Sequence, residues 1–212
     1  MNTYLYTYEP SRIAMLTTAT DDEQTFLDAQ KSHLQSFVNT GEGIFAGETT
    51  LTDSRHFGMV IFHADDDDSA DALVANDPTV RERTMRACRY PLKISLWNSD
   101  ALALDNAQQH FFYRIQPVRP AMLSAGATEE EGQIMGAHFM YLKDLTERGI
   151  FAFAGPTLVL DYSNFGIGLL RADDLASAWE IGNNDPAVQG RVMRLTILPF
   201  AIIASDTQYT PE

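Results

Sequence analysis

The sequence has little cysteine, little positive charge and no long apolar run. Its one cysteine among 212 residues, Cys88, cannot form a disulfide within the chain and cannot build a cysteine-rich zinc site. A chain with this cysteine usage suits a reducing compartment. We therefore expect a cytoplasmic protein.

Basic residues are scarce: 15 Lys and Arg stand against 29 Asp and Glu, which gives a formal charge of −14. An acidic surface repels both nucleic-acid phosphates and anionic lipid headgroups. We therefore expect no nucleic acid and no membrane among the partners. A small-molecule substrate is the partner that we expect, and a homodimer of the chain stays open.

Hydrophobic segments are short. The longest, residues 195–204, cannot span a bilayer and contains Pro199. The first ten residues, MNTYLYTYEP, lack the basic segment followed by an apolar segment that marks a signal peptide. These features predict a soluble chain.

A segment of 35 residues occurs twice. Residues 57–91 and 165–199 are identical at 15 of 35 positions at a constant offset of 108, where ordinary composition gives roughly two matches. The shared core contains A-D-D, then S-A, then N-D-P-x-V-x-x-R-x-M-R. Because a fixed period reveals the folding unit, we expect each half of the chain to be one unit.

Both halves show the same order of secondary-structure signals. Aromatic, β-branched strands begin at residues 3 and 110, and T-x-x-E capping boxes at Thr20 and Thr128 begin helices that end near Asn39 and Glu147. Two strands and a helix follow. Asn-Asp-Pro then starts a short helix that contains the repeated arginines, and the last strands are expected at residues 89–97 and 197–204.

The predicted order is β-α-β-β-α-β in each half, which is the ferredoxin-like order. We expect an α+β fold made of two tandem ferredoxin-like units that pack sheet to sheet, as in a dimeric α/β barrel within one chain. The expected domains are residues 1–97 and 109–204, with a linker at 98–108 and a polar tail at 205–212.

The sequence resembles the YciI-like (YCII-related) family. The second half carries the closer likeness, through Arg119-Pro120, His138 with Leu142, Leu145 and Gly149, then Gly155-Pro156 and Asp185-Pro186. The first half departs from this pattern at Ile13 and Glu48. Its histidine, His33, lies 105 residues before His138, so it is out of register with the flanking motifs.

The resemblance implies the dimeric ferredoxin-like barrel and a His/Asp pair as the active site, in a pocket between sheet and helix. It also implies chemistry without a cofactor, since one type of family member is a dehydrochlorinase that uses none. The substrate is not implied.

His138 is the first candidate for acid/base chemistry, because imidazole titrates near neutral pH and a carboxylate beside it fixes its tautomer. Asp185 is its expected partner, and His33 with Asp77 is the expected pair in the first half. The alternative for His138 is a histidine at the edge of the core. For Asp185 and Asp77 the alternative is an N-cap, because Asp followed by Pro is an ordinary helix start.

Arg119 and Arg12 follow the first strand of each half and are candidates for holding an anionic group of a substrate. Their alternative role is an ion pair on the surface. No metal site is expected, because the acidic run 65–68 keeps only two of its aspartates in the second copy.

We therefore expect a cofactor-independent enzyme that isomerises or eliminates a group from a small, cyclic or enolisable metabolite. Two alternatives remain: a non-catalytic protein that binds a ligand in the same pocket, and a relative of the oxygenases on this fold.

Overall fold

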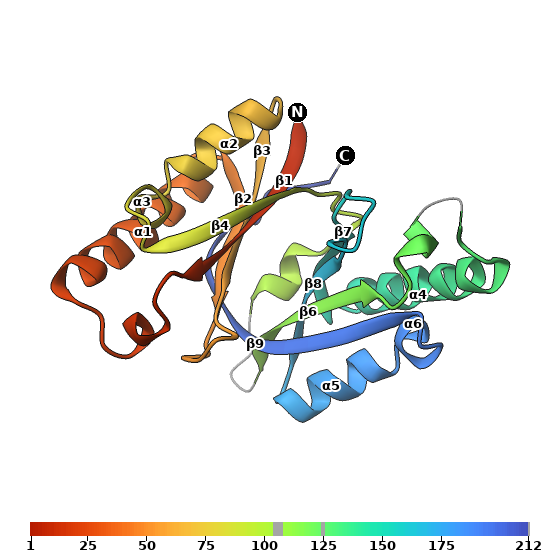
Figure 1. Ribbon diagram of the computed structural model, residues 1–212. Helices are drawn as coiled ribbons and strands as arrows, with labels where there is room; N and C mark the ends of the chain where they lie inside the picture. The colour runs from red at the N-terminus through yellow and green to blue at the C-terminus, as the bar shows by residue number, and fades with distance from the viewer. Residues whose placement is uncertain (104–107, 124–125, 212) are drawn as a thin grey trace. The chain divides into compact units, whose positions relative to one another are not determined.

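The computed structural model describes residues 1–103, 108–123 and 126–211. Contacts divide the chain into two compact units: unit 1 contains Met1–Pro91 and Phe200–Asp206, and unit 2 contains Leu92–Pro199 and Thr207–Glu212. Figure 1 shows the elements of both. The fold is α+β, as expected, and its strands form a large antiparallel sheet.

Unit 1 has the expected β-α-β-β-α-β order. Its strands run β4-β1-β3-β2, and the last residues of β9 pair with β2. In chain order the elements are β1 (Asn2–Pro10), η1 (Ile13–Leu16), α1 (Asp21–Asn39), β2 (Gly43–Thr49), β3 (Gly58–Ala64), α2 (Asp67–Ala75), α3 (Pro78–Arg81) and β4 (Met85–Pro91).

Unit 2 repeats this order. Its strands run β9-β6-β8-β7, and β5 pairs with β7. The elements are β5 (Leu96–Trp97), η2 (Ser99–Leu102), β6 (Gln109–Pro117), η3 (Pro120–Leu123), α4 (Glu129–Glu147), β7 (Phe151–Pro156), β8 (Gly166–Ala172), α5 (Leu175–Asn183), α6 (Pro186–Gln189) and β9 (Met193–Ser205).

The units differ from the expected domains 1–97 and 109–204. Leu96 and Trp97 pair with β7 and so belong to unit 2, whereas Phe200–Ser205 pair with β2 and belong to unit 1. Residues 104–107 of the expected linker lie outside the described residues. The expected packing of the two units sheet to sheet stays a prediction.

The signals that predicted helix ends are confirmed. Thr20 and Thr128 each accept from the backbone N–H three residues on, and Glu23 and Glu131 reach back to complete both capping boxes. After α1 and α4 the chain turns at glycines with positive φ, Gly41 at 81° and Gly149 at 70°.

The predicted start of the last strands was wrong. β4 begins at Met85 and β9 at Met193, earlier than expected, so Arg86 and Arg194 lie in strands and not in the short helices. The short helices end because Arg83 and Arg191 take left-handed backbone conformations, with φ of 56° and 57°.

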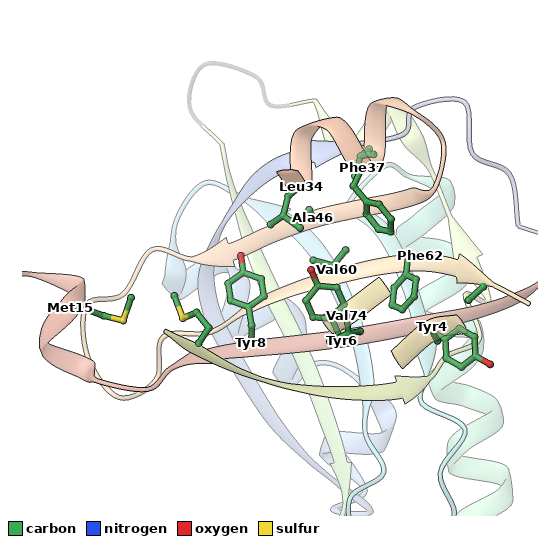
Figure 2. Close-up of a cluster of buried hydrophobic side chains, with 14 residues drawn as sticks. Tyr4, Tyr6, Tyr8, Met15, Leu34, Phe37, Ala46, Val60, Phe62 and Val74 are labelled. Carbon is green, nitrogen blue, oxygen red and sulfur yellow. The ribbon is translucent and has the colours of Figure 1, made fainter. Parts of the chain in front are cut away.

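Every second side chain of the first strand in each unit points into the hydrophobic core of that unit. Tyr4, Tyr6 and Tyr8 point from β1 into a buried cluster that also receives Leu34 and Phe37 from α1 (Figure 2). In unit 2, Phe111, Tyr113 and Ile115 of β6 enter a corresponding cluster with Leu142 and Leu145 of α4. One face of each long helix is therefore held against the sheet, which fixes the side chains on that face.

Gly155 of β7 is required by a close backbone approach. A Cβ there would lie 1.8 Å from the Lys93 carbonyl oxygen, whereas a Cβ at Gly132 in α4 would meet nothing within 4 Å. We expect Gly155→Ala to lower the free energy of unfolding by roughly 1–3 kcal/mol. Gly132→Ala should raise it by about 0.5–1 kcal/mol, because alanine favours the helix.

Urea denaturation of the two variants checks this pair of expectations. Equal effects of the two substitutions would show that the close approach at Gly155 does not limit the side chain there.

Candidate active site

His138 and Asp185 meet in unit 2. His138 projects from the sheet-facing side of α4, and its Nδ1 lies 2.9 Å from Oδ1 and 2.7 Å from Oδ2 of Asp185. Asp185 is fully buried and the His138 side chain is 11% exposed. The structure therefore brings the two residues into direct hydrogen-bond contact.

Asp185 is also the N-cap of α6, as its Asp-Pro sequence predicts. Its side chain accepts from the Ala187 N–H at 2.8 Å, and Pro186 occupies the first helical position. The cap fixes the carboxylate at the start of the short helix, from which it also reaches His138. The two interpretations of Asp185 are thus compatible.

Tyr113 is a third member that sequence reasoning missed. Its hydroxyl donates to Asp185 Oδ2 at 2.5 Å from the middle of β6. Burial raises the pKa of Tyr113, and the charge of Asp185 raises it further, so the phenol remains a donor at neutral pH. The signal was present: Tyr6 and Tyr113 occupy matching places in the first strands of the two halves.

The Asp185 carboxylate determines which ring nitrogen of His138 carries the proton. An ionised carboxylate only accepts hydrogen bonds, so His138 places its proton on Nδ1 towards Asp185. The other ring nitrogen, Nε2, then carries a lone pair when the ring is neutral. This arrangement can accept a proton at Nε2, and the adjacent carboxylate stabilises the imidazolium that forms.

A cavity of about 280 Å³ adjoins His138. Apolar side chains from α4, β6 and β8 form most of its wall, together with Leu96 and Met193. Four polar side chains complete the lining: Ser95, Tyr113, His138 and Asn164. The histidine therefore faces a mainly apolar space.

Asn164 and Ser95 differ in what they offer to a ligand. The Asn164 amide donates both protons to backbone, to the carbonyls of Thr157 and Val159, so only its carbonyl oxygen remains. The backbone N–H of Ser95 is bonded to Ala154, and no described group accepts from the Ser95 hydroxyl. Ser95 is thus the available neutral donor at this cavity.

Arg119 does not line the cavity. Its guanidinium pairs with Glu131, the capping-box residue of α4, and donates to the Gly126 carbonyl. Arg12 makes the same ion pair with Glu23 in unit 1. Both arginines thus hold the connecting segment to the start of the long helix, and the ion pair lowers the pKa of Glu131 and takes that of Glu23 to about 2.

The structure does not bring His33 and Asp77 together. Asp77 is fully buried, and its carboxylate accepts hydrogen bonds from Tyr6, Thr79 and Gln30. His33 lies further along α1, where its ring stacks on that of Phe37 with 5.8 Å between the ring centroids. Gln30 is the residue 108 positions before His138. Applying the constant offset of 108 to His138 would have identified Gln30 as the residue that faces Asp77.

No cluster of three or more metal-binding side chains occurs among the described residues. Within the same residues, no helix has the length and apolar character needed to cross a membrane.

Comparisons with known proteins support the fold and, for part of the chain, a family. Residues 111–201 match the model of the YCII-related domain, which covers the His138–Asp185 site. The comparison with curated proteins found no match. The family match concerns the second half of the chain alone.

Solved structures share the fold over almost the whole chain. A heme-binding protein from Thermus thermophilus has a TM-score of 0.57 at 12% identity, covering 95% of this chain and 91% of its own. A mutant chlorite dismutase from Candidatus Nitrospira defluvii has a TM-score of 0.55 at 8% identity, with coverages of 95% and 91%. A candidate monooxygenase from Lactobacillus acidophilus scores 0.54 at 7% identity, with coverages of 96% and 95%.

The cavity in unit 2 does not fit a haem. Its volume of about 280 Å³ lies at the lower end of the roughly 300–1,000 Å³ typical of ligand pockets, and a tetrapyrrole needs a large one. No lysine or arginine is found among its described lining residues to pair with two propionates. His138, Tyr113, Met135 and Met193 are of residue types that can ligate haem iron, so the misfit lies in the volume and in the lack of a cation among the described lining residues.

Two aspartate caps provide a matched test of what Asp185 does. Asp174 caps α5 at the surface by accepting from Ser177, whereas Asp185 caps α6 and also holds His138 and Tyr113. We expect Asp174→Ala to cost about 1 kcal/mol of stability. Asp185→Ala should cost roughly 3–5 kcal/mol, because two buried donors lose their acceptor.

Chemical denaturation of both variants measures the difference. A cost for Asp185→Ala no larger than that for Asp174→Ala would mean that the buried contacts add nothing to the cap.

The raised pKa of Tyr113 predicts a loss of stability in alkali. Above about pH 10 the unfolded chain releases the phenol proton while the folded chain retains it, so stability falls as pH rises. Tyr113→Phe removes this group. Its unfolding free energy should fall less steeply than that of the wild type, by about 1.4 kcal/mol per pH unit above pH 10.

Urea titrations between pH 9 and pH 11.5 give the two slopes. Parallel slopes would show that Tyr113 ionises as readily in the folded chain as in the unfolded one.

Proposed function

We propose that unit 2 is a cofactor-independent acid/base catalyst that isomerises a small apolar metabolite or eliminates a leaving group from it. The observation that carries this proposal is the contact between His138 Nδ1 and the buried Asp185 carboxylate at the wall of an apolar cavity. The family match over residues 111–201 supports it.

In the proposed reaction, His138 Nε2 removes a proton from a carbon next to a carbonyl or a leaving group. In an elimination, the electrons of the C–H bond form the new double bond, and the leaving group departs with its own bonding pair. In an isomerisation, the imidazolium returns the proton to another carbon. Asp185 stabilises the imidazolium in both cases, and Tyr113 holds Asp185 in place.

Ser95 is the proposed donor to the oxygen on which negative charge develops. Its hydroxyl is the neutral donor described above, and a donor at this point stabilises an enolate more than the ketone that precedes it. Asn164 contributes an acceptor, its carbonyl oxygen. The proposed substrate therefore has one carbonyl-type oxygen on an otherwise apolar frame.

The hairpin loop between β7 and β8 supports an apolar substrate. Its ends, Pro156 and Asn164, line the cavity, and its exposed side chains include Leu158, Leu160 and Tyr162. The residues 108 positions earlier are Thr50, Thr52 and Ser54. Of the two matching hairpin loops, the one beside the apolar cavity therefore has large apolar side chains where the other has small polar ones.

Arg119 is assigned a structural role in this proposal, because Glu131 already neutralises it. For the first half we propose the same ancestry and fold, as a tandem YCII-related unit, on the strength of the repeat at offset 108. Its histidine is replaced by Gln30, so we propose no proton transfer there.

The decisive variant is His138→Gln. Unit 1 already holds a glutamine, Gln30, against an aspartate N-cap at 2.9 Å, so this substitution keeps the hydrogen bond to Asp185 and removes the basic nitrogen. We expect a loss of activity of about 10²–10⁴-fold, the usual contribution of a general base, with little loss of stability. His33→Gln on α1 is the matched control and should keep full activity.

Proton–deuterium exchange into ring ketones and chlorinated cyclic acids in D₂O, followed by NMR, measures proton removal before the natural substrate is known. Exchange that is equal in wild type and His138→Gln would refute the proposal. Probes that bind in the cavity of the wild type but never exchange would identify unit 2 as a non-catalytic ligand-binding module.

A further inference from the structure

Unit 1 contains a second cavity that the proposed reaction does not use. Its volume is about 370 Å³, and α1, η1, β2 and the loop after β2 form its wall. It also receives Ile203 from the part of β9 that belongs to unit 1. The catalytic proposal for unit 2 gives this cavity no role.

The cavity occupies the place in unit 1 that the His138 cavity occupies in unit 2. For seven residues that line the cavity of unit 2, the residue 108 positions earlier lines the cavity of unit 1, and for Ser95 the residue 108 positions later, Ile203, does so. The chemistry changes at these positions. The pairs are Phe139 and Lys31, Pro156 and Glu48, His138 and Gln30, Asn164 and His56, and Ser95 and Ile203.

Gln30 presents a fixed acceptor to this cavity. Its Nε2 donates to the Asp77 carboxylate at 2.9 Å, and because an ionised carboxylate only accepts, the amide orientation is determined. Gln30 Oε1 is then the acceptor left for a ligand, beside the second Nε2 proton, and the residue is 4% exposed. Like His138 Nε2 it accepts a hydrogen bond, but an amide oxygen is not basic enough to remove a proton.

Carboxylates add negative charge around the same space. Glu48 stands where unit 2 has Pro156, and Asp28 lies one helical turn before Lys31 with one oxygen bonded to Gln24. The hydroxyl of Tyr8 is buried next to Glu48 without completing a hydrogen bond to any described group. Lys31 is exposed and is the one cation among the described lining residues.

We propose that unit 1 binds a small primary ammonium compound in this cavity and does not transform it. The ammonium group donates to Gln30 Oε1 and to the Glu48 carboxylate, and its alkyl part packs against Met15, Leu27 and Met85. A charged donor between two acceptors forms charge-assisted hydrogen bonds. The net charge of −14 attracts such cations to the molecule.

n-Butylammonium is the probe, and 1-butanol and butyrate are its neutral and anionic counterparts of similar size. In two-dimensional ¹H–¹⁵N NMR spectra of the full chain, butylammonium should shift the Thr49 amide and the Gln30 side-chain amide with saturation, at a dissociation constant on the order of millimolar. Butanol should bind more weakly and butyrate should not bind.

Glu48→Gln should weaken butylammonium binding roughly tenfold, because it keeps the shape and removes the charge. Glu42→Gln is the matched control: it makes the same change of net charge at an exposed residue just before β2, at the other end of the strand from Glu48, and should change binding less than twofold. The spectra themselves report whether each variant is folded.

Three results would overturn the proposal. They are absence of shifts at Gln30 and Thr49 up to about 100 mM probe, equal binding of butanol and butylammonium by the wild type, and equal weakening by Glu48→Gln and Glu42→Gln. The comparison of probes on the wild type decides the matter even where Glu48→Gln fails to fold.

Discussion

A fully buried aspartate at the start of a four-residue helix ties each unit together. Asp185 joins α6 to β6 through Tyr113 and to α4 through His138, and Asp77 joins the matching elements of unit 1. A buried carboxylate is costly unless donors surround it, so the cap, the sheet tyrosine and the helix residue must all be in place. The same requirement that stabilises each unit also positions a side chain at the wall of a cavity.

The arrangement has different chemical properties in the two units, because one of the partners differs. Imidazole at residue 138 can take a proton on the atom that faces the cavity, while the amide at residue 30 is not basic enough to take one and can only form hydrogen bonds. The side chains that line the two cavities differ as well: they are mainly apolar around His138 and more polar around Gln30. A duplicated scaffold with one basic side chain is therefore suited to catalysis in unit 2 and to binding in unit 1.

The ion pairs of Arg12 and Arg119 illustrate how one motif is compatible with two roles. An arginine after the first strand suggested an anchor for a substrate anion, but in both units the guanidinium meets the capping-box glutamate of the long helix. The glutamate lies 11 or 12 residues further along the chain, and only the folded segment shows that the two groups meet. The family match covers residues 111–201, and the contact partner of each arginine is given by the structure alone.

Much of the local structure followed from short-range signals. The capping boxes, the glycines after the long helices and the Asp-Pro helix starts depend on backbone groups within a few residues, so the sequence predicts them well. The strand ends were harder. Arg83 and Arg191 stop the short helices in a left-handed conformation that no local motif marks, so β4 and β9 begin earlier than expected.

The sequence by itself determined the order of elements in each half, because both halves repeat the same signals. It also named the His138–Asp185 pair, because the family resemblance implies such a pair. The tertiary structure alone decided that Tyr113 completes this pair, that Gln30 and not His33 faces Asp77, and that residues 92–97 and 200–205 join the other half's strands. The physical reason is distance along the chain. Contacts between residues 47 to 160 positions apart depend on how strands pair and helices pack, which local patterns do not encode.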